Sequence, residues 1–186
     1  MNLLYPQGKA PIPVNNETCD HLKNTKIPNI SLPTQNGNLL NLNRSDTFRL
    51  VIYFYPMTGH PNKSLPHNWN SITGARGCTS QTCSFRDNYD ELVSLNALPI
   101  GITTQSIDDI KEMTTRLQIP YDVLSDQNLI LVKIMNLPTF SIKKNLYIKR
   151  LTLIVEKTYI KKVFYPVLSP NKHIKDVLNY LKRQQT

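Results

Sequence analysis

The sequence has few cysteines and no long apolar segment. Three cysteines in 186 residues are too few for a disulfide scaffold, and an odd number suits a reducing compartment. The longest apolar runs, residues 50–55 and 151–155, are far shorter than the roughly 20 residues that cross a membrane. Residues 1–13 also lack the charged-then-apolar pattern of a secretion signal. We therefore expect a cytoplasmic protein without a membrane partner.

Acidic residues are scarce too, with 13 Asp and Glu against 22 Lys and Arg, which gives a formal net charge of +9. A basic balance of this kind raises the question of a nucleic-acid partner. The basic residues are scattered, however, with local density only in the second half of the chain, and no base-stacking motif accompanies them. We interpret them as a solvated basic face and expect no nucleic-acid partner.

Metal-binding patterns are missing as well. A structural zinc site needs two ligand pairs, whereas Cys78 and Cys83 form a single Cys-x4-Cys pair. His60 and His67 lie in a loop-like segment without zinc spacing. The sequence therefore predicts neither a metal nor a cofactor.

The order of the predicted elements indicates an α/β fold. We expect a Pro- and Asn-rich N-terminal arm over residues 1–27 and one domain over 28–186. The domain should open with a hairpin around Asn36-Gly37 and continue with a buried strand over 48–55 and a long loop over 57–77. The remaining helices are expected over 78–96, 106–117, 125–135 and 169–182, and the second of them should open with a capping box at Ser106-Ile107-Asp108-Asp109. Strands are expected over 99–104, 121–124, 145–155 and 159–164. This order predicts a central mixed sheet with helices on both faces.

What the sequence does contain is a pair of cysteines at the start of a predicted helix, in the run Gly77-Cys78-Thr79-Ser80-Gln81-Thr82-Cys83. Free N–H groups and the dipole at a helix N-terminus favour the thiolate, which is the reactive form, and Arg76 lies close by in the sequence. The surrounding residues are too polar for a core face. Cys78 is therefore predicted to be a reactive thiol and Cys83 the thiol that resolves it.

The spacing of these cysteines predicts a conformational change. On an ideal helix, Cα atoms five residues apart are about 8.7 Å from each other, and a disulfide needs less than about 7 Å. Cys78 and Cys83 can therefore bond only after the first turns of the helix unwind, and the weak helix formers Thr79 and Ser80 suit such a segment. We interpret the third cysteine, Cys19, as a non-catalytic surface residue, with a second resolving thiol as the alternative.

Six motifs in sequence order together resemble one family. They are Val51-Ile52-Tyr53-Phe54-Tyr55-Pro56, Gly77-Cys78-Thr79-Ser80-Gln81-Thr82-Cys83, Phe85-Arg86-Asp87, Gly101-Ile102-Thr103-Thr104, Leu124-Ser125-Asp126 and Lys149-Arg150-Leu151-Thr152-Leu153. Over roughly residues 28–182 the chain is similar to the peroxiredoxins, in particular to the bacterioferritin-comigratory or Q-type branch. The Gly-Cys-Thr-x-x-x-Cys run with Arg-Asp behind it is quite specific, whereas the other motifs are weak alone.

This resemblance implies a thioredoxin-like fold and a thiol-dependent peroxidase. The substrates would be hydrogen peroxide and organic hydroperoxides, and the reductant thioredoxin or a similar dithiol. Residue by residue, Cys78 matches the peroxidatic cysteine and Cys83 the resolving one. Pro56 matches the proline that shields the site, and Arg150 the distant arginine that stabilises thiolate and peroxide. An internal Cys78–Cys83 bridge would allow a working monomer, and a homodimer stays open.

The chain departs from the family pattern in front of Cys78. The family usually has a threonine three residues before the peroxidatic cysteine and a proline seven before it. Here Ala75 stands at the first position and Pro56 lies far upstream, so residues 57–75 resemble an insertion. The role of the threonine could pass to Thr58 or Thr73, and we favour Thr58 because it stays next to the proline.

Two other functions are kept as alternatives. Residues 137–140, Leu-Pro-Thr-Phe, resemble the cis-proline segment of thioredoxins. A thioredoxin-type reductase needs Cys-x-x-Cys, which is absent, so a thiol–disulfide oxidoreductase or a redox sensor without turnover is the second hypothesis. A basic surface-binding module is the third.

Overall fold

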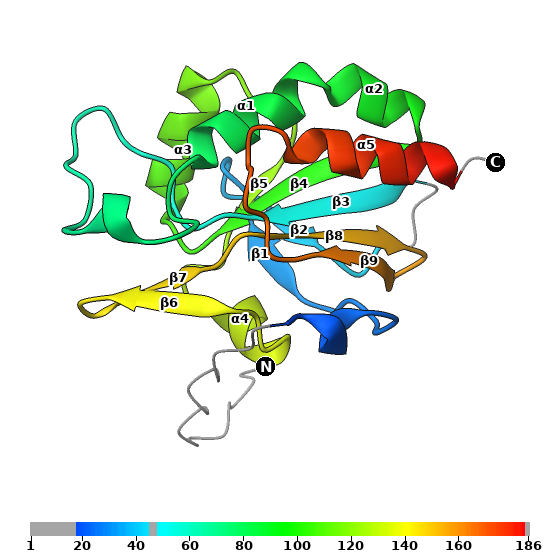
Figure 1. The fold of residues 1–186 in the computed structure, drawn as a ribbon, viewed down its shortest axis with the longest axis horizontal. Coiled ribbons are helices and arrows are strands. Elements are labelled where there is room, and N and C mark those ends of the chain that lie inside the picture. The colour runs from blue at the N-terminus through cyan, green and yellow to red at the C-terminus, as the bar shows by residue number, and fades with distance from the viewer. Residues whose placement is uncertain (1–17, 45–47, 185–186) are drawn as a thin grey trace.

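A five-stranded mixed sheet forms the centre of the molecule (Figure 1). The computed structural model describes residues 18–44 and 48–184. The strands lie in the order β5-β4-β3-β8-β9, and β3 runs parallel to β4 and antiparallel to β8. Their bounds are Arg49–Phe54 for β3, Ala97–Thr103 for β4, Val123–Ser125 for β5, Leu151–Glu156 for β8 and Tyr159–Phe164 for β9. The strand expected over 48–55 is thus the central one.

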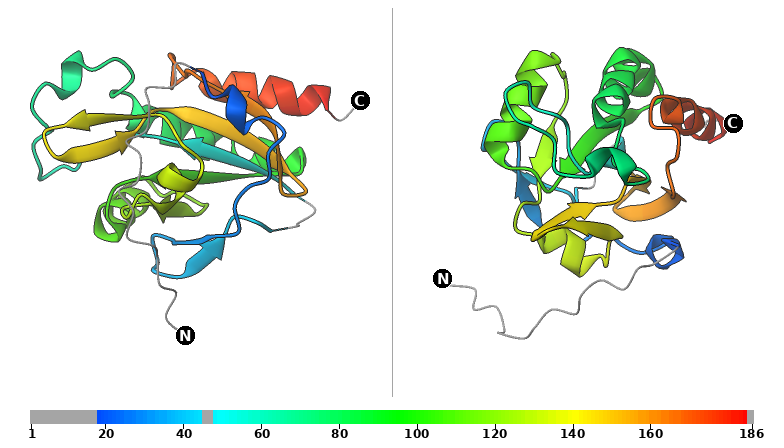
Figure 2. Two further views of the ribbon diagram at one scale, coloured as in Figure 1. Left: turned by 90° about the horizontal axis from the view of Figure 1, so that it is seen from below. Right: turned by 60° about the vertical axis from the view of Figure 1, so that its left-hand side comes forward.

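Helices cover both faces of the sheet, as predicted (Figures 1 and 2). Helices α1, α2, α3 and α5 pack on one face, while the short α4 and a hairpin of β1 and β2 pack on the other. The bounds are Cys78–Asp87 for α1, Tyr89–Ser94 for α2, Ile107–Arg116 for α3, Ile130–Ile134 for α4, His173–Arg183 for α5, Ser31–Pro33 for β1 and Leu39–Asn41 for β2.

The alternation of side chains along β3 decides which residues reach the face covered by α1. Ile52 and Phe54 point to the α4 face, and Tyr53 and Tyr55 point to the opposite face, where they share a buried cluster with Cys78. Successive residues of a strand point to opposite faces, so a strand buried on both sides reads as one apolar run. This alternation brings two tyrosines to Cys78.

Two local predictions are confirmed. Strands β1 and β2 pair antiparallel around Asn36-Gly37, where Gly37 has a φ of +80°, a conformation natural to glycine. The expected cap of α3 is also present, because the Ser106 hydroxyl accepts a hydrogen bond from the backbone N–H of Asp109 at 3.2 Å.

The single helix predicted over 78–96 is wrong, because Asn88 divides it into α1 and α2. The side-chain amide of Asn88 donates to the carbonyl of Ser84 at 2.8 Å. A short side chain that bonds to nearby backbone groups competes with the helical hydrogen bonds. The apolar spacing continues across the break, which is why the pattern alone did not reveal it.

The single strand predicted over 145–155 is also wrong. The chain forms β7 (Asn145–Ile148), breaks at Lys149 and Arg150, and resumes as β8. At the break, the Lys149 N–H donates to the carbonyl of Pro138 at 2.8 Å. Strand β7 pairs instead with β6 (Thr139–Ile142), which the sequence pattern did not indicate. The break frees the Arg150 side chain to point into the interior.

The resemblance of residues 137–140 to a cis-proline segment is not matched by the backbone. Within the described residues, the cis peptide bond is the one between Tyr165 and Pro166.

The interpretation of Cys19 as a surface residue is wrong. Its exposed fraction is 3 %, and it packs with Leu22 and Ile27 in the core on the α4 face of the sheet. Burial raises the pKa of the Cys19 thiol to about 12, so this thiol stays protonated near neutral pH. Cys19 and Cys78 therefore belong to cores on opposite faces of the sheet.

The described part of the expected N-terminal arm lies alongside β9. It contains the 3-10 helix η1 (Asp20–Leu22) and a bridge between Lys26 and Tyr159. Residues 1–17 lie outside the described residues, and the division into an arm over 1–27 and a domain over 28–186 stays a prediction. Within residues 18–44 and 48–184, no helix has the length and apolar character that crossing a membrane requires.

Candidate active site

Cys78 is the first residue of α1, and a glycine sets its position. Gly77 has a φ of +93°, and a Cβ added there would lie 2.4 Å from Cγ of Pro170. The chain therefore enters α1 through a left-handed position that has room only for glycine. The Cys78 side chain is 3 % exposed, and its Sγ donates to the Ala75 carbonyl at 3.4 Å.

Arg150 reaches Cys78 from the break between β7 and β8. Its Nη2 lies 3.2 Å from the Cys78 Sγ, although the two residues are 72 positions apart in the sequence. The same nitrogen donates to the carbonyl oxygens of Gly74 at 3.2 Å and Arg76 at 2.9 Å. Arg150 is 3 % exposed. The planar guanidinium holds its N–H donors in a fixed fork, so this contact directs a charged donor at the sulfur.

Gln81 is a site residue that the sequence analysis missed. It lies one helical turn after Cys78, is fully buried, and accepts a hydrogen bond at Oε1 from Nη1 of Arg150. Residues three apart on a helix share a face, so this spacing was the signal that could have identified it. With Gln81 on one nitrogen and Cys78 on the other, both ends of the guanidinium fork are held.

Three buried polar atoms around this site have no hydrogen-bond partner within the described residues: the Tyr55 hydroxyl, Nε2 of Gln81 and Nε of Arg150. Burial raises the pKa of Tyr55 well above its usual value of 10, and electrostatic contacts with Tyr53 and Cys78 add to the shift. All three groups can donate. Unpaired buried donors are rare in folded proteins.

Cys83 lies on the same intact helix and is half-buried. The middle of α1 is held by Tyr121, whose hydroxyl donates to the Thr82 carbonyl at 2.9 Å, and by Tyr53, whose hydroxyl donates to Thr82 Oγ1 at 3.4 Å. Phe85 stacks on Tyr53 with ring centroids 4.4 Å apart. Contact of the two cysteines therefore requires the first turns of α1 to open and these contacts to loosen.

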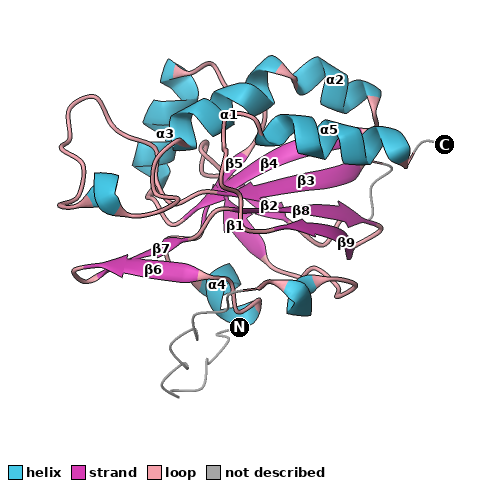
Figure 3. Ribbon diagram, in the orientation of Figure 1, coloured by secondary structure: helices cyan, strands magenta, loops and turns pink. Residues whose placement is uncertain are grey.

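A cleft with a volume of about 450 Å³ opens onto Cys78. Its other walls come from the loop before α1, which carries the 3-10 helix η2 (Trp69–Ser71; Figure 3), and from the first residues of α1. Within the described ranges, no group of three or more His, Cys, Asp and Glu side chains is placed to hold a metal ion.

A comparison with protein-family models identifies the family. The model described as Redoxin matches residues 22–181, which is most of the chain and includes every residue of the Cys78 site. The chain belongs to the Redoxin family.

The relatives of this Redoxin-family chain carry peroxiredoxin names. It is 28 % identical over 163 residues to a chloroplastic peroxiredoxin Q of Arabidopsis thaliana, covering 86 % of this chain and 67 % of the relative. It is 24 % identical over 160 residues to a putative peroxiredoxin bcp of Coxiella burnetii, covering 84 % of this chain and 95 % of the relative. The match thus spans about two thirds of the Arabidopsis relative and nearly all of the bacterial one.

Solved structures give the same fold. The crystal structure of peroxidoxin BcpB from Mycobacterium tuberculosis superposes with a TM-score of 0.70 at 21 % identity, covering 87 % of this chain and 96 % of that one. The expected thioredoxin-like fold and the resemblance to Q-type peroxiredoxins are confirmed.

The residues that the family pattern assigns in front of Cys78 lie as follows. Pro56 is buried, and its carbonyl accepts a hydrogen bond from Thr103 Oγ1 at 3.1 Å. Thr58 is buried, and its hydroxyl donates to Gln105 Oε1 at 3.1 Å. Thr73 is exposed. Arg150 thus contacts Cys78 directly. Thr58 instead bonds to the Gln105 side chain, through both its backbone N–H and its backbone carbonyl.

His173 is a buried titratable residue close enough to Arg150 to feel its charge. Its titration should make the free energy of unfolding depend on pH. It is 4 % exposed, and its Nε2 lies 2.9 Å from Thr152 Oγ1. Burial lowers the pKa of His173 from 6.5 to about 4, and the charge of Arg150 lowers it further, while Asp176 opposes the shift. The unfolded chain therefore takes up the proton at a higher pH than the folded one.

As a result, the contribution of His173 to the free energy of unfolding should be fully present above pH 6.5 and should fall by up to about 3 kcal/mol as the pH drops toward 4. Urea unfolding at pH 7 and pH 5 measures it. His173→Gln keeps a hydrogen-bonding side chain at Thr152 and should remove most of this pH dependence. An equal pH dependence in the variant would contradict the prediction.

Proposed function

We propose that this protein is a thiol-dependent peroxidase that reduces hydrogen peroxide and organic hydroperoxides at Cys78. The observation that carries the proposal is the 3.2 Å contact between Arg150 Nη2 and the Cys78 Sγ at the N-terminus of α1. Helix N-terminus and guanidinium both favour the thiolate. The names of the relatives point to the same chemistry.

The proposed reaction has three steps. The Cys78 thiolate attacks the peroxide O–O bond and takes one oxygen, so that the sulfur is oxidised to sulfenic acid and the other oxygen leaves as water or an alcohol after gaining a proton. The Cys83 thiol then attacks the sulfenic sulfur, which forms the disulfide and releases water. An external dithiol reduces the disulfide and restores both thiols.

The other site residues have proposed roles in the first step. Arg150 holds the thiolate and the leaving oxygen of the peroxide, on which negative charge develops, and Gln81 orients Arg150. Pro56 shields the site from water. Thr58 remains our candidate for the hydroxyl that orients the peroxide, and in that role its hydroxyl would have to leave its hydrogen bond to Gln105. Thr73 is the second candidate.

Consumption of peroxide by the purified protein tests the function. The assay supplies thioredoxin, thioredoxin reductase and NADPH, and it follows NADPH oxidation after addition of hydrogen peroxide or cumene hydroperoxide. A thiol–disulfide oxidoreductase would reduce protein disulfides without consuming peroxide, and a redox sensor would be oxidised once without turnover. Repeated turnover at a rate proportional to enzyme concentration supports the peroxidase.

We expect peroxide to produce a disulfide between Cys78 and Cys83 within one chain, with loss of helix over the first turns of α1. The intact helix separates the two Cα atoms by about 8.7 Å, so the bridge cannot form without unwinding. Non-reducing digestion and mass spectrometry should find both cysteines in one linked peptide. Amide exchange between Cys78 and Arg86 should speed up on oxidation.

Cys83→Ser separates the steps. It should leave the first oxidation of Cys78 intact, while turnover with thioredoxin should stop because no thiol on the chain resolves the sulfenic acid. A link between Cys78 and Cys19, or a disulfide-bonded dimer, would overturn this mechanism. Burial of Cys19 on the opposite face of the sheet argues against the first of these.

The same proposal covers the substrates, the reductant, the oligomeric state and the compartment. Hydroperoxides are the substrates and thioredoxin or a similar dithiol is the reductant. An internal disulfide makes the monomer sufficient for catalysis, and a homodimer is compatible with it. A chain with three unpaired cysteines suits the reducing conditions of the cytoplasm.

A further inference from the structure

We propose that the inserted loop and Arg76 make this enzyme selective for organic hydroperoxides that carry a carboxylate. The inference rests on the proposed peroxidase function and concerns the cleft at Cys78. The apolar side chains of the loop would receive the body of the substrate, and Arg76 would bind its anionic group. The hydroperoxide would then lie at the sulfur.

The cleft has an apolar wall that the loop supplies. Met57, Leu65 and Trp69 all line it, together with Ala75 at its base. Leu65 is 44 % exposed, whereas Trp69 is 4 % exposed and is fixed by an edge contact with the Tyr147 ring, with ring centroids 5.2 Å apart. A concave apolar wall with a few polar groups is typical of a site for a small organic molecule.

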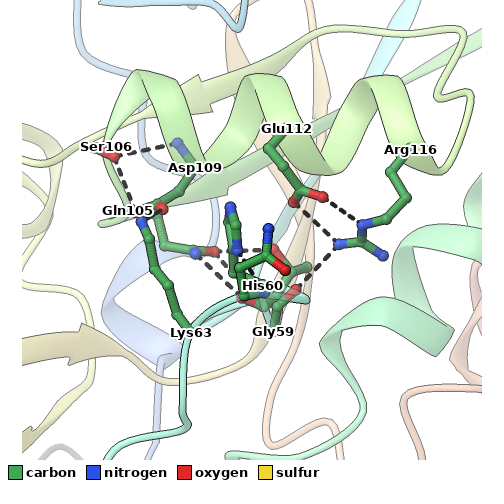
Figure 4. A network of polar contacts seen from close by, with 10 residues as sticks. Gly59, His60, Lys63, Gln105, Ser106, Asp109, Glu112 and Arg116 are labelled. Atoms are coloured by element: carbon green, nitrogen blue, oxygen red, sulfur yellow. Dashed lines mark hydrogen bonds and ion pairs between the residues drawn. The ribbon is translucent and has the colours of Figure 1, made fainter.

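The loop is anchored to α3, so the wall is formed before substrate arrives (Figure 4). Nζ of Lys63 pairs with Asp109 at 2.5 Å, and Arg116 donates to the Gly59 carbonyl at 3.1 Å. At the start of the loop, the backbone N–H of Thr58 also donates to the Gln105 side chain. Preformed walls lower the ordering cost of binding.

Among the described residues that line the cleft, Arg76 is the only charged one. Its side chain is exposed, and no hydrogen bond or ion pair of that side chain is found within residues 18–44 and 48–184. Its backbone is fixed, because the Arg76 carbonyl accepts from Arg150 at 2.9 Å. A guanidinium fork without a partner, two residues before the reactive cysteine, is suited to a carboxylate.

Two probes that differ only in charge test the inference. They are cumene hydroperoxide and its 4-carboxylate derivative. The measured quantity is kcat/KM for the carboxylate derivative divided by kcat/KM for cumene hydroperoxide. Any effect of Arg76 on the thiolate is common to both probes and cancels in the ratio. For Arg76→Gln we expect this ratio to fall about fivefold to tenfold, the size of one charge-assisted hydrogen bond at a partly exposed site. Arg76→Lys should keep part of the preference.

Two controls complete the design. Lys161→Gln removes one positive charge from an exposed position on β9 and should leave the ratio unchanged. In the wild type, added salt should slow the carboxylate probe more than the neutral one. Normal turnover with the same ratio in the wild type, Arg76→Gln and Lys161→Gln overturns the inference alone. Failure of the wild type to consume either probe or hydrogen peroxide overturns the proposed function, and the inference with it.

Discussion

Replacing Cys78 by serine should abolish peroxide turnover. A serine hydroxyl is almost fully protonated near neutral pH and cannot form the sulfenic acid, so the rate should fall by about 10³-fold or more. The coupled thioredoxin assay measures turnover, and mass spectrometry after peroxide treatment measures the added oxygen. Neither should exceed the background of a reaction without protein.

Cys19→Ser is the matched control for this variant. It makes the same substitution in the core on the other face of the sheet, so activity should be retained as long as the protein folds. Circular dichroism of both variants reports folding. Substantial turnover by Cys78→Ser would remove Cys78 from the role of nucleophile.

Arg150→Lys should slow the oxidation of Cys78 by about tenfold or more. Lysine keeps the positive charge but loses the fork that contacts Cys78, two carbonyl oxygens and Gln81 at once. Loss of one donor that stabilises a developing oxyanion costs on the order of 10²-fold in other enzymes. The second-order rate constant with hydrogen peroxide under single-turnover conditions measures the effect.

The chain provides its own probe for this experiment, because its single tryptophan, Trp69, lines the cleft at Cys78. Stopped-flow fluorescence can therefore follow the oxidation directly. Arg183→Lys, at the end of α5, makes the same exchange at an exposed position and should not change the rate. Equal rate constants for wild type and Arg150→Lys would show that charge alone, without the geometry of the fork, supports the reaction.

Local signals in the sequence were sufficient for much of the fold. Asn36-Gly37 predicted the hairpin and Ser106 predicted the cap of α3, since both depend on a few neighbouring residues. The break at Asn88 escaped because the apolar spacing continues through it. The β6–β7 hairpin was not predicted because its turn, Lys143-Lys144, lacks the Asn-Gly type of signal that marks a tight hairpin.

The site was predicted less completely, for a related reason. Cys78 and Cys83 were predicted as site residues from their place at a helix start, and Arg150 only from resemblance to a family. The hydrogen bond of Gln81 to Arg150 joins residues 69 positions apart, and no local pattern specifies it. Cys19 was misjudged because its polar neighbours in the sequence suggested a surface position, whereas packing beneath the sheet buries it.

By itself, then, the sequence determined the succession of the central-sheet strands along the chain, the position of Cys78 at the start of α1, and the spacing that forbids a Cys78–Cys83 bridge in an intact helix. These follow from helical geometry, strand alternation and capping, which act over a few residues. The tertiary structure alone decided that Arg150 meets Cys78, that Cys19 lies on the other side of the sheet, and that the inserted loop walls the cleft. Such contacts depend on the register of β3 against β8 and on the packing of the loop against α3, which no local pattern encodes.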